Sequence, residues 1–154
     1  GMASIAGTSS MASEGGVGSV LADIMVSNNE DEVLARNGHL PASRIRRVAL
    51  KDVLVDTGAL TLCLPERLIA ELGLPLKRRV SSATAAGVIE TAVHDHATVA
   101  VAGREGVFEC LALPDGARPL LGLAPLEMLG LQPDVAKQNL RLLPDDTRDT
   151  YIIA

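Results

Sequence analysis

Apolar residues occur along this chain mostly in short runs or in alternation with polar residues, a pattern typical of β-strands. The β-prone stretch 19–27 and the apolar residues of 33–38 flank the polar segment Asn-Asn-Glu-Asp-Glu at 28–32. We predict a hairpin over these residues, with the polar segment as its turn. After a polar loop, the Val- and Leu-rich pattern of 44–55 predicts a strand that leads directly into Asp56.

The chain must reverse direction after this strand, because the sequence Asp-Thr-Gly is followed at once by another apolar stretch, 59–64. The next segment, 65–73, predicts a short helix. It begins with a proline, which suits a first helical turn, and ends with a glycine, which suits a C-terminal cap. Three of its apolar residues share one helical face, namely Leu68, Ile69 and Leu72.

A second hairpin is predicted over 79–103, where two β-rich arms flank the small residues Ser-Ala-Thr-Ala-Ala-Gly. Its tip is expected near Ala85, Ala86 and Gly87. The apolar stretch 107–114 then predicts another strand.

The last part of the domain predicts a short strand, a helix and a closing hairpin. Leu120 and Leu121 are expected in the strand, and residues 124–130 in a second short helix with a proline near its start. Residues 134–144 predict a tight hairpin around Lys137–Asn139, with Asp134 as a turn residue ahead of it. The chain is therefore predicted to be mainly β, with two short helices.

One folded domain is expected, because 154 residues with 47% hydrophobic content suffice for one core and are too few for two of ordinary size. Residues 1–17 are rich in Gly, Ser and Ala, which bury little surface, so we expect a flexible N-terminal tail before a domain over 18–144. Residues 145–154 form a C-terminal tail, in which a polar spacer leads to the strong β-formers Tyr151–Ile153.

Composition excludes several classes of function. A net charge of −5 and an aromatic content of 1% argue against nucleic-acid binding, and the short basic cluster Lys77–Arg79 is expected to be a solvated turn. No apolar run approaches the roughly 18 residues of a membrane span, and no signal-peptide pattern is present, so we expect a cytoplasmic protein without a membrane partner. Cys63 and Cys110 lie in apolar stretches, where reduced thiols act as small core residues.

Asp56 is out of place in this pattern, because it stands between apolar runs in Val-Leu-Val-Asp-Thr-Gly-Ala-Leu-Thr-Leu. Aspartate is depleted in strands, and burial of its charge without partners costs several kcal/mol. One interpretation is a turn aspartate that caps backbone N–H groups beside a glycine. The other interpretation is a functional carboxylate.

The order of these segments resembles that of the retroviral-type (retropepsin-like) aspartic proteases, and it is most similar to their bacterial single-domain relatives. The most specific matches are Asp56-Thr57-Gly58-Ala59, at the end of an apolar strand, and Leu120-Leu121-Gly122, ahead of a helix. The resemblance covers about residues 19–144. It implies a closed β-barrel-type protease half, in which each chain supplies one catalytic loop.

The resemblance also implies a reason for Asp56. Two chains related by a two-fold axis bring two such aspartates together, and carboxyls in contact share a proton because both cannot ionise cheaply. One carboxylate takes a proton from water while the protonated one polarises the scissile carbonyl. The implied activity is that of an aspartic endopeptidase that acts as a homodimer on an extended peptide or protein, without a metal or cofactor.

The neighbours of Asp56 have roles implied by the same family. Thr57 hydrogen-bonds to the partner's loop across the two-fold axis, and Ala59 leaves room close to the two aspartates. Gly58 permits the tight turn, and its N–H can point at the carboxylates. Gly122 lets the strand after Leu121 pass close behind the catalytic loop.

Two further segments have counterparts in the family. The hairpin tip at Ala85, Ala86 and Gly87 corresponds to the flap that folds over substrate, although it has no aromatic residue. The C-terminal tail is a candidate for a strand that pairs across the two-fold axis. Its alternatives are a frayed end and a segment that lies in a substrate groove.

Other interpretations remain open on the sequence alone. His94 and His96 lie two apart on an expected strand, as metal ligands could, but a solvated strand face explains them without a metal. A non-catalytic module that keeps the dimeric fold and binds extended peptide is the alternative to a protease.

Overall fold

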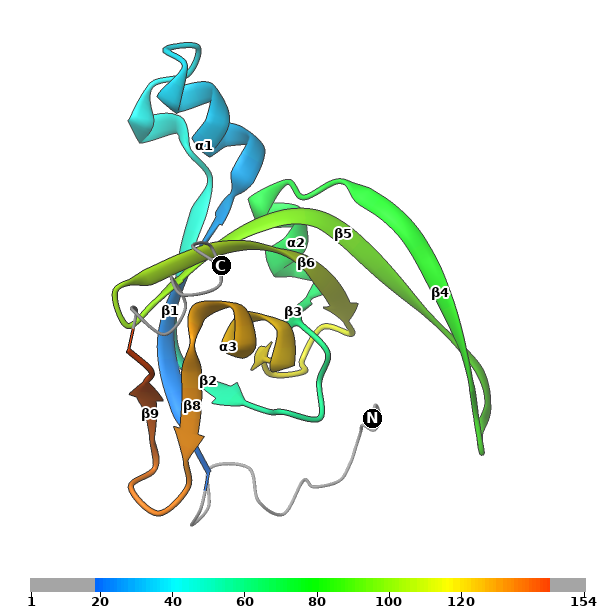
Figure 1. Cartoon of the computed structure of the whole chain (residues 1–154). Coiled ribbons are helices and arrows are strands. Elements are labelled where there is room, and N and C mark those ends of the chain that lie inside the picture. Colours follow the sequence, from blue (N-terminus) through cyan, green and yellow to red (C-terminus); the bar gives the residue numbers. More distant parts are fainter. Residues whose placement is uncertain (1–18, 145–154) are drawn as a thin grey trace, which may run out of the picture.

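The computed structural model describes residues 19–144 of the chain, so the expected tails over 1–17 and 145–154 lie outside the described residues. Strands and short helices follow one another along this part of the chain (Figure 1). In chain order the elements are β1 (Leu21–Asn28), α1 (Asn29–Arg36), η2 (Ala42–Arg44), β2 (Arg47–Val55), β3 (Leu62–Pro65), α2 (Glu66–Leu72), β4 (Leu76–Thr84), β5 (Gly87–Val101), β6 (Arg104–Leu113), β7 (Leu120–Leu121), α3 (Leu123–Leu129), β8 (Leu131–Asp134) and β9 (Asn139–Leu142).

Seven of these strands form one sheet in the order β1-β2-β7-β3-β6-β5-β4. β1 also pairs antiparallel with β5, from Met25 opposite Ala100 to Asn28 opposite Ala97, so six of the strands close into a ring. Closure removes the free edges that an open sheet would expose. In the described part of the chain, β4 lies outside the ring, and β8 and β9 form a separate two-stranded sheet. The predicted mainly β fold with a closed sheet is confirmed.

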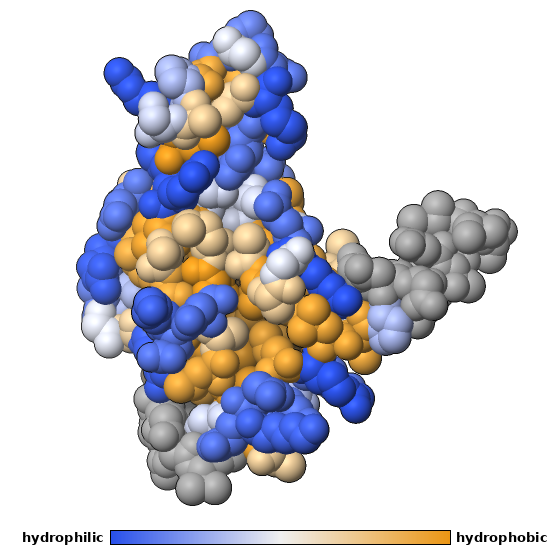
Figure 2. Space-filling model, turned by 90° about the vertical axis from the view of Figure 1, so that its left-hand side faces the viewer, coloured by the Kyte–Doolittle hydropathy of each residue, from blue (hydrophilic) through white to orange (hydrophobic). Residues whose placement is uncertain are grey.

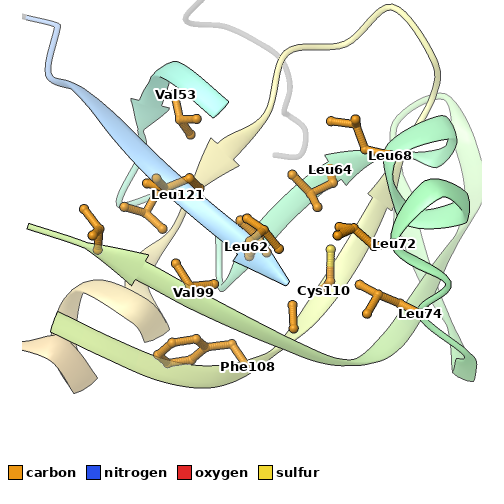
Figure 3. Packing of buried hydrophobic residues seen from close by; sticks show 14 of the residues in the cluster. Val53, Leu62, Leu64, Leu68, Leu72, Leu74, Val99, Phe108, Cys110 and Leu121 are labelled. Carbon is orange, nitrogen blue, oxygen red and sulfur yellow. The ribbon is translucent and has the colours of Figure 1, made fainter. Parts of the chain in front are cut away.

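Aliphatic side chains from several strands fill the ring. Val53, Leu62, Val99 and Leu121 come from four different strands and are each at most 1% exposed (Figure 3). Phe108, the one phenylalanine of the chain, closes part of this core and is 6% exposed. Burial of a side chain of this size stabilises the fold by about 1.5–3 kcal/mol.

The two cysteines are buried and form no disulfide. Cys110 belongs to the core cluster, and burial raises the pKa of its thiol. The expectation that both thiols are core residues is confirmed.

Both helices predicted from the sequence are present. α2 follows Pro65 and ends at Gly73, which adopts the left-handed conformation (φ 67°), and α3 ends in the same way at Gly130 (φ 66°). The left-handed conformation costs glycine little, which explains why each helix stops there. α2 packs on β3, and α3 packs on β6 and β8. Among residues 19–144, no helix is long and apolar enough to cross a membrane.

The first predicted hairpin is wrong beyond its first strand, because the residues after Asn28 form α1. The Asn28 side chain accepts a hydrogen bond from the Asp31 N–H (2.9 Å), which caps the helix. Glu30, Asp31 and Glu32 occupy the first turn, where the positive end of the helix dipole stabilises acidic residues. α1 is thus a third α-helix in the described residues, where the sequence predicted two.

A buried polar network fixes α1 to the ring. Asp31 accepts hydrogen bonds from the backbone N–H and the Nε of Arg46 (3.0 and 2.9 Å), and these bonds lower the pKa of Asp31. The Asn28 amide donates to the Leu72 carbonyl (2.9 Å) and to the Gly73 carbonyl (3.3 Å). The start of α1 is therefore connected to the end of α2.

The predicted hairpin over 79–103 is present as β4 and β5. Its residues 79–92 pair only with each other in the described part of the chain, and we call this segment the arm. Figure 1 shows the arm as a long, bent ribbon that projects from the body. The expectation of a solvated turn at Lys77–Arg79 is wrong, because β4 already begins at Leu76.

The closing hairpin is also confirmed, with Asp134 opposite Asn139. Asp134 was expected as a turn residue ahead of this hairpin, but it is the last residue of β8, and its carboxylate accepts a hydrogen bond from the Lys137 N–H in the turn (3.1 Å). Figure 2 shows a broad apolar area on the side of the molecule where β1, β8 and β9 lie. Met25 of β1 and Leu142 of β9 are 39% and 46% exposed.

Candidate active site

The Asp-Thr-Gly sequence forms a tight loop at the end of β2. The Asp56 N–H donates to the Leu121 carbonyl (3.0 Å), which continues the parallel pairing of β2 with β7. The Ala59 N–H donates to the Asp56 carbonyl (3.0 Å), and the Gly58 N–H donates to the Asp56 carboxylate (2.8 Å). The carboxylate is thereby held by the backbone of its own loop.

The start of α3 supports this loop from behind. The N–H groups of Leu123 and Ala124 donate to the carbonyls of Ala59 and Leu60 (2.8 and 2.9 Å). The first N–H groups of a helix have no partner within the helix, and here the loop supplies two. A Cβ added to Gly122 would lie 2.4 Å from the Thr61 carbonyl oxygen and 2.6 Å from that of Ala59. The close approach therefore requires glycine.

Thr61 anchors the loop on its other side. Its hydroxyl donates to the Glu109 carbonyl of β6 (2.9 Å). The sequence analysis missed this contact, because a residue in a β-prone stretch gives no local sign of a distant partner.

The outer part of the loop faces solvent. Thr57 is exposed, and its hydroxyl makes no hydrogen bond within residues 19–144. The side chain of Leu60 is 73% exposed, although the Leu60 carbonyl accepts a hydrogen bond from the start of α3. Leu123, the first residue of α3, is 36% exposed. The sequence analysis assigned no role to either leucine. The loop that holds the Asp56 carboxylate, together with the start of α3, therefore exposes one threonine and two leucines.

Cys63 lies on β3, the strand that follows the Asp56 loop. It is 4% exposed, and burial together with the charge of Asp56 raises the pKa of its thiol to about 12. A thiol with this pKa is protonated at neutral pH and is not a nucleophile.

One face of the arm continues the side of the sheet that carries Cys63. Cys63 pairs with Leu111, which pairs with Val93, and alternate residues of a strand share a face. Thr91 and Ile89 of β5 therefore point the same way as Val93, and Val80 opposite Thr91 joins them. Val80 and Ile89 are 39% and 50% exposed. The arm thus presents an apolar face on the side that carries Cys63.

The expected flap residues form the tip of the arm. Ala85 and Ala86 make the turn, and Gly87, with a φ of 122°, begins β5. A residue with a side chain rarely adopts this φ, so the turn depends on glycine. The tip carries only methyl groups and hydrogens beyond its backbone.

The two histidines on β5 have separate partners. A bulge lies between His94 and Ala97, and the His94 Nδ1 is 2.9 Å from the Leu74 carbonyl. His96 is 47% exposed on its side chain and lies 3.0 Å from an Asp95 carboxylate oxygen. Residues 19–144 contain no group of three His, Cys, Asp or Glu side chains arranged to hold a metal ion.

A closed ring of strands, an Asp-Thr-Gly loop braced by a glycine and a helix, and a projecting hairpin together define the fold of a retropepsin-like aspartic protease. The comparison with known families agrees, because the model of the aspartyl protease family matches residues 35–124. The chain belongs to this family of peptidases. The matched segment includes Asp56 and the whole arm. No curated protein matches the chain.

Proposed function

We propose that this chain is an aspartic endopeptidase whose active site forms between two copies, with one Asp56 from each. The observation that carries the proposal is the fixed Asp56 carboxylate, next to the exposed Thr57, in a chain that contains one Asp-Thr-Gly. One carboxylate cannot be both the base that activates water and the acid that polarises the carbonyl. A two-fold axis beside the loop supplies the second.

In this mechanism the two aspartates share one proton, because two carboxylates in contact cannot both ionise cheaply. The ionised group takes a proton from a water molecule, and the resulting hydroxide attacks the scissile carbonyl carbon. The protonated group donates a hydrogen bond to the carbonyl oxygen, which takes up negative charge. Collapse of the tetrahedral intermediate, with transfer of a proton to the nitrogen, releases the amine.

The loop geometry supports specific roles for the neighbours of Asp56. The Gly58 N–H orients the carboxylate. Gly122 allows α3 to approach the loop, and the hydrogen bonds from α3 hold the loop in place. Thr57 is free to hydrogen-bond to the loop of a second copy, and Ala59 leaves space at the pair of aspartates. The exposed Leu60 would be covered in the assembled dimer, which removes an apolar side chain from water.

The arm supports an extended peptide as the substrate. Its tip at Ala85, Ala86 and Gly87 corresponds, in the order of segments, to the flap with which retropepsin-like proteases cover an extended peptide. Its apolar face, with Val80 and Ile89, favours apolar peptide side chains beneath it. Closure of the arm over the peptide would exclude water from the reaction.

A non-catalytic module that binds extended peptide is the second candidate. The tip of small residues favours it, because no side chain there fixes a closed position of the arm. The intact Asp56-Thr57-Gly58-Ala59 sequence favours the protease, since a binding module gains nothing from two opposed carboxylates. The assignment of residues 18–144 as the protease domain and the cytoplasmic location stay predictions.

The experiment that tests the proposal is cleavage of a denatured protein between pH 4 and 7 by the purified chain. We expect cleavage that a pepstatin-type inhibitor stops and that Asp56→Asn abolishes. Asp52→Asn is the matched control, because Asp52 is exposed on β2 and should leave the rate unchanged. Binding of peptide by wild type without cleavage at any pH would favour the binding module.

A further inference from the structure

A cluster of charged side chains lies where the arm leaves the ring, and we call it the root cluster. Lys77 and Arg78 of β4 both contact Glu109 of β6, with Nζ and Nη1 at 2.7 and 3.0 Å from one carboxylate oxygen. A second nitrogen of Arg78 lies 3.2 Å from the other oxygen, so this pair is bidentate. Lys77 also reaches Asp95 of β5 (3.4 Å), and His96 lies beside Asp95 (3.0 Å).

The root cluster lies at the base of the arm, where it can hold the arm in one orientation relative to the ring. β5 separates β4 from β6 in the sheet, so Lys77 and Arg78 must reach across β5 to Glu109. Both hairpin strands are irregular here, with register shifts between Leu76 and Arg78 and between His94 and Ala97. Such bulges bend strands and interrupt their pairing. The contacts to Glu109 therefore span the part of the hairpin where the regular pairing of the strands is interrupted.

Glu109 also contacts the catalytic loop, through a different atom. Its backbone carbonyl accepts the hydrogen bond from the Thr61 hydroxyl at the end of that loop. Its side chain points to the face of the sheet that carries Leu111, Val93 and the apolar face of the arm, because alternate and directly paired residues share a face. One residue thus connects the loop of Asp56 with the base of the arm.

We propose that Glu109 is a positioning residue that fixes the orientation of the arm relative to the loop that carries Asp56. This inference rests on the proposed protease function. Thr61 fixes the backbone of β6 to the loop, and the Glu109 carboxylate fixes the base of the arm to the same strand. Loss of the carboxylate leaves the base of the arm held to the ring by the pairing of β5 with β6, which is interrupted between His94 and Ala97.

The electrostatics are consistent with a contact that persists at acidic pH. Hydrogen bonds from Arg78 and Lys77 lower the pKa of Glu109 to about 2. A carboxylate with a lowered pKa stabilises the folded state above its ordinary pKa of about 4.5, and this contribution is lost as the pH falls toward 2. Glu109 therefore remains ionised across the pH range of 4 to 7 used in the cleavage assay.

The effect of its removal should be several-fold rather than complete. The side chains of Glu109, Lys77 and Arg78 are 32%, 41% and 49% exposed, and exposed ion pairs are individually weak. Two cations on one carboxylate, one of them bidentate, form a small network, which contributes more than a single pair.

Hydrogen exchange of the unliganded protein tests the proposal without reliance on catalysis. Glu109→Gln keeps the shape of the side chain and removes its charge, and we expect the amides of the arm to exchange about three- to fivefold faster. The matched control is Glu105→Gln on the same strand, since Glu105 is exposed and forms no ion pair within residues 19–144. Exchange in the arm that is the same for wild type and Glu109→Gln would overturn the proposal.

Peptide cleavage gives a second readout. Because the catalytic loop keeps its own supports, Glu109→Gln should raise KM by about three- to fivefold and change kcat by less than about twofold. Arg78→Gln should act similarly, and the double variant should be little worse than either one. Additive effects of the two substitutions, or a loss confined to kcat, would contradict the proposal. A wild type that cleaves no peptide refutes the proposed function alone, since the exchange comparison still decides the role of Glu109.

Discussion

Replacement of Gly122 by alanine should displace the loop that carries Asp56. The new methyl group would lie 2.4, 2.6 and 2.8 Å from three backbone atoms, the carbonyl oxygens of Thr61 and Ala59 and the Ala59 carbonyl carbon. The first distance is about 1 Å short of the 3.4 Å at which ordinary contact begins. No flexible side chain can move aside to relieve this clash, so the loop backbone or α3 must shift.

The expected cost follows from this overlap. Overpacking in a well-packed region destabilises a protein by about 1–3 kcal/mol. A shift of the loop also strains the hydrogen bonds from Leu123 and Ala124 to the loop carbonyls, each worth about 1 kcal/mol. In a domain of this size, each kcal/mol lowers Tm by roughly 2–4 °C. Misplacement of a reacting group by about 1 Å costs on the order of 100-fold in rate.

The assay compares Tm and kcat/KM for Gly122→Ala, Gly38→Ala and wild type. Gly38 has a φ of 75° with open space around it, so alanine there costs about 1–2 kcal/mol of backbone strain without touching the catalytic loop. We expect both variants to have a lower Tm than wild type, and only Gly122→Ala to lose about 100-fold in kcat/KM. A Gly122→Ala variant with wild-type Tm and wild-type kcat/KM would refute this account of the loop.

Three further predictions address the fold and the assembly. Asn28→Ala removes the cap of α1 and leaves the Leu72 carbonyl unpaired, so it should lower the free energy of unfolding by about 2–3 kcal/mol in urea titration; a change below about 0.5 kcal/mol would contradict the role of this network. Thr57→Val should weaken dimerisation in sedimentation whereas Thr57→Ser should not, and equal dimerisation of both would exclude a hydrogen bond from Thr57 across the axis. Truncation after Pro144 should weaken dimerisation if the C-terminal tail pairs across the axis; unchanged dimerisation with higher activity would indicate an occluding tail, and no change would exclude both roles.

Local signals in the sequence were sufficient for the elements next to the active site. Gly73 and Gly130 mark where α2 and α3 end, because only glycine adopts the left-handed conformation there at little cost. The loop at Asp56 was expected from a turn sequence between two apolar stretches, and the hairpin of β4 and β5 from two β-rich segments around small residues.

Other features depend on competition between local signals or on distant contacts. Asn28 and the acidic residues after it can form a turn or a helix start, and the helix prevails because Arg46 and the end of α2 bind its first residues. Lys77–Arg79 were expected in a solvated turn; they are exposed but belong to β4, and the partner of Lys77 and Arg78, Glu109, lies about thirty residues away in the sequence. The pairing of β1 with β5, which closes the ring, joins residues that are farther apart still, such as Asn28 and Ala97.

The central claim is that each active site takes one Asp56 from each of two chains. The most direct measurement is the activity of wild type and Asp56→Asn refolded together in equal amounts at a constant total concentration, high enough for dimers to form. If the site is shared, random pairing leaves about a quarter of the dimers with two aspartates, and activity should fall to about a quarter of that of wild type alone. An activity of about one half would show that each chain works with its own aspartate, and would contradict the claim.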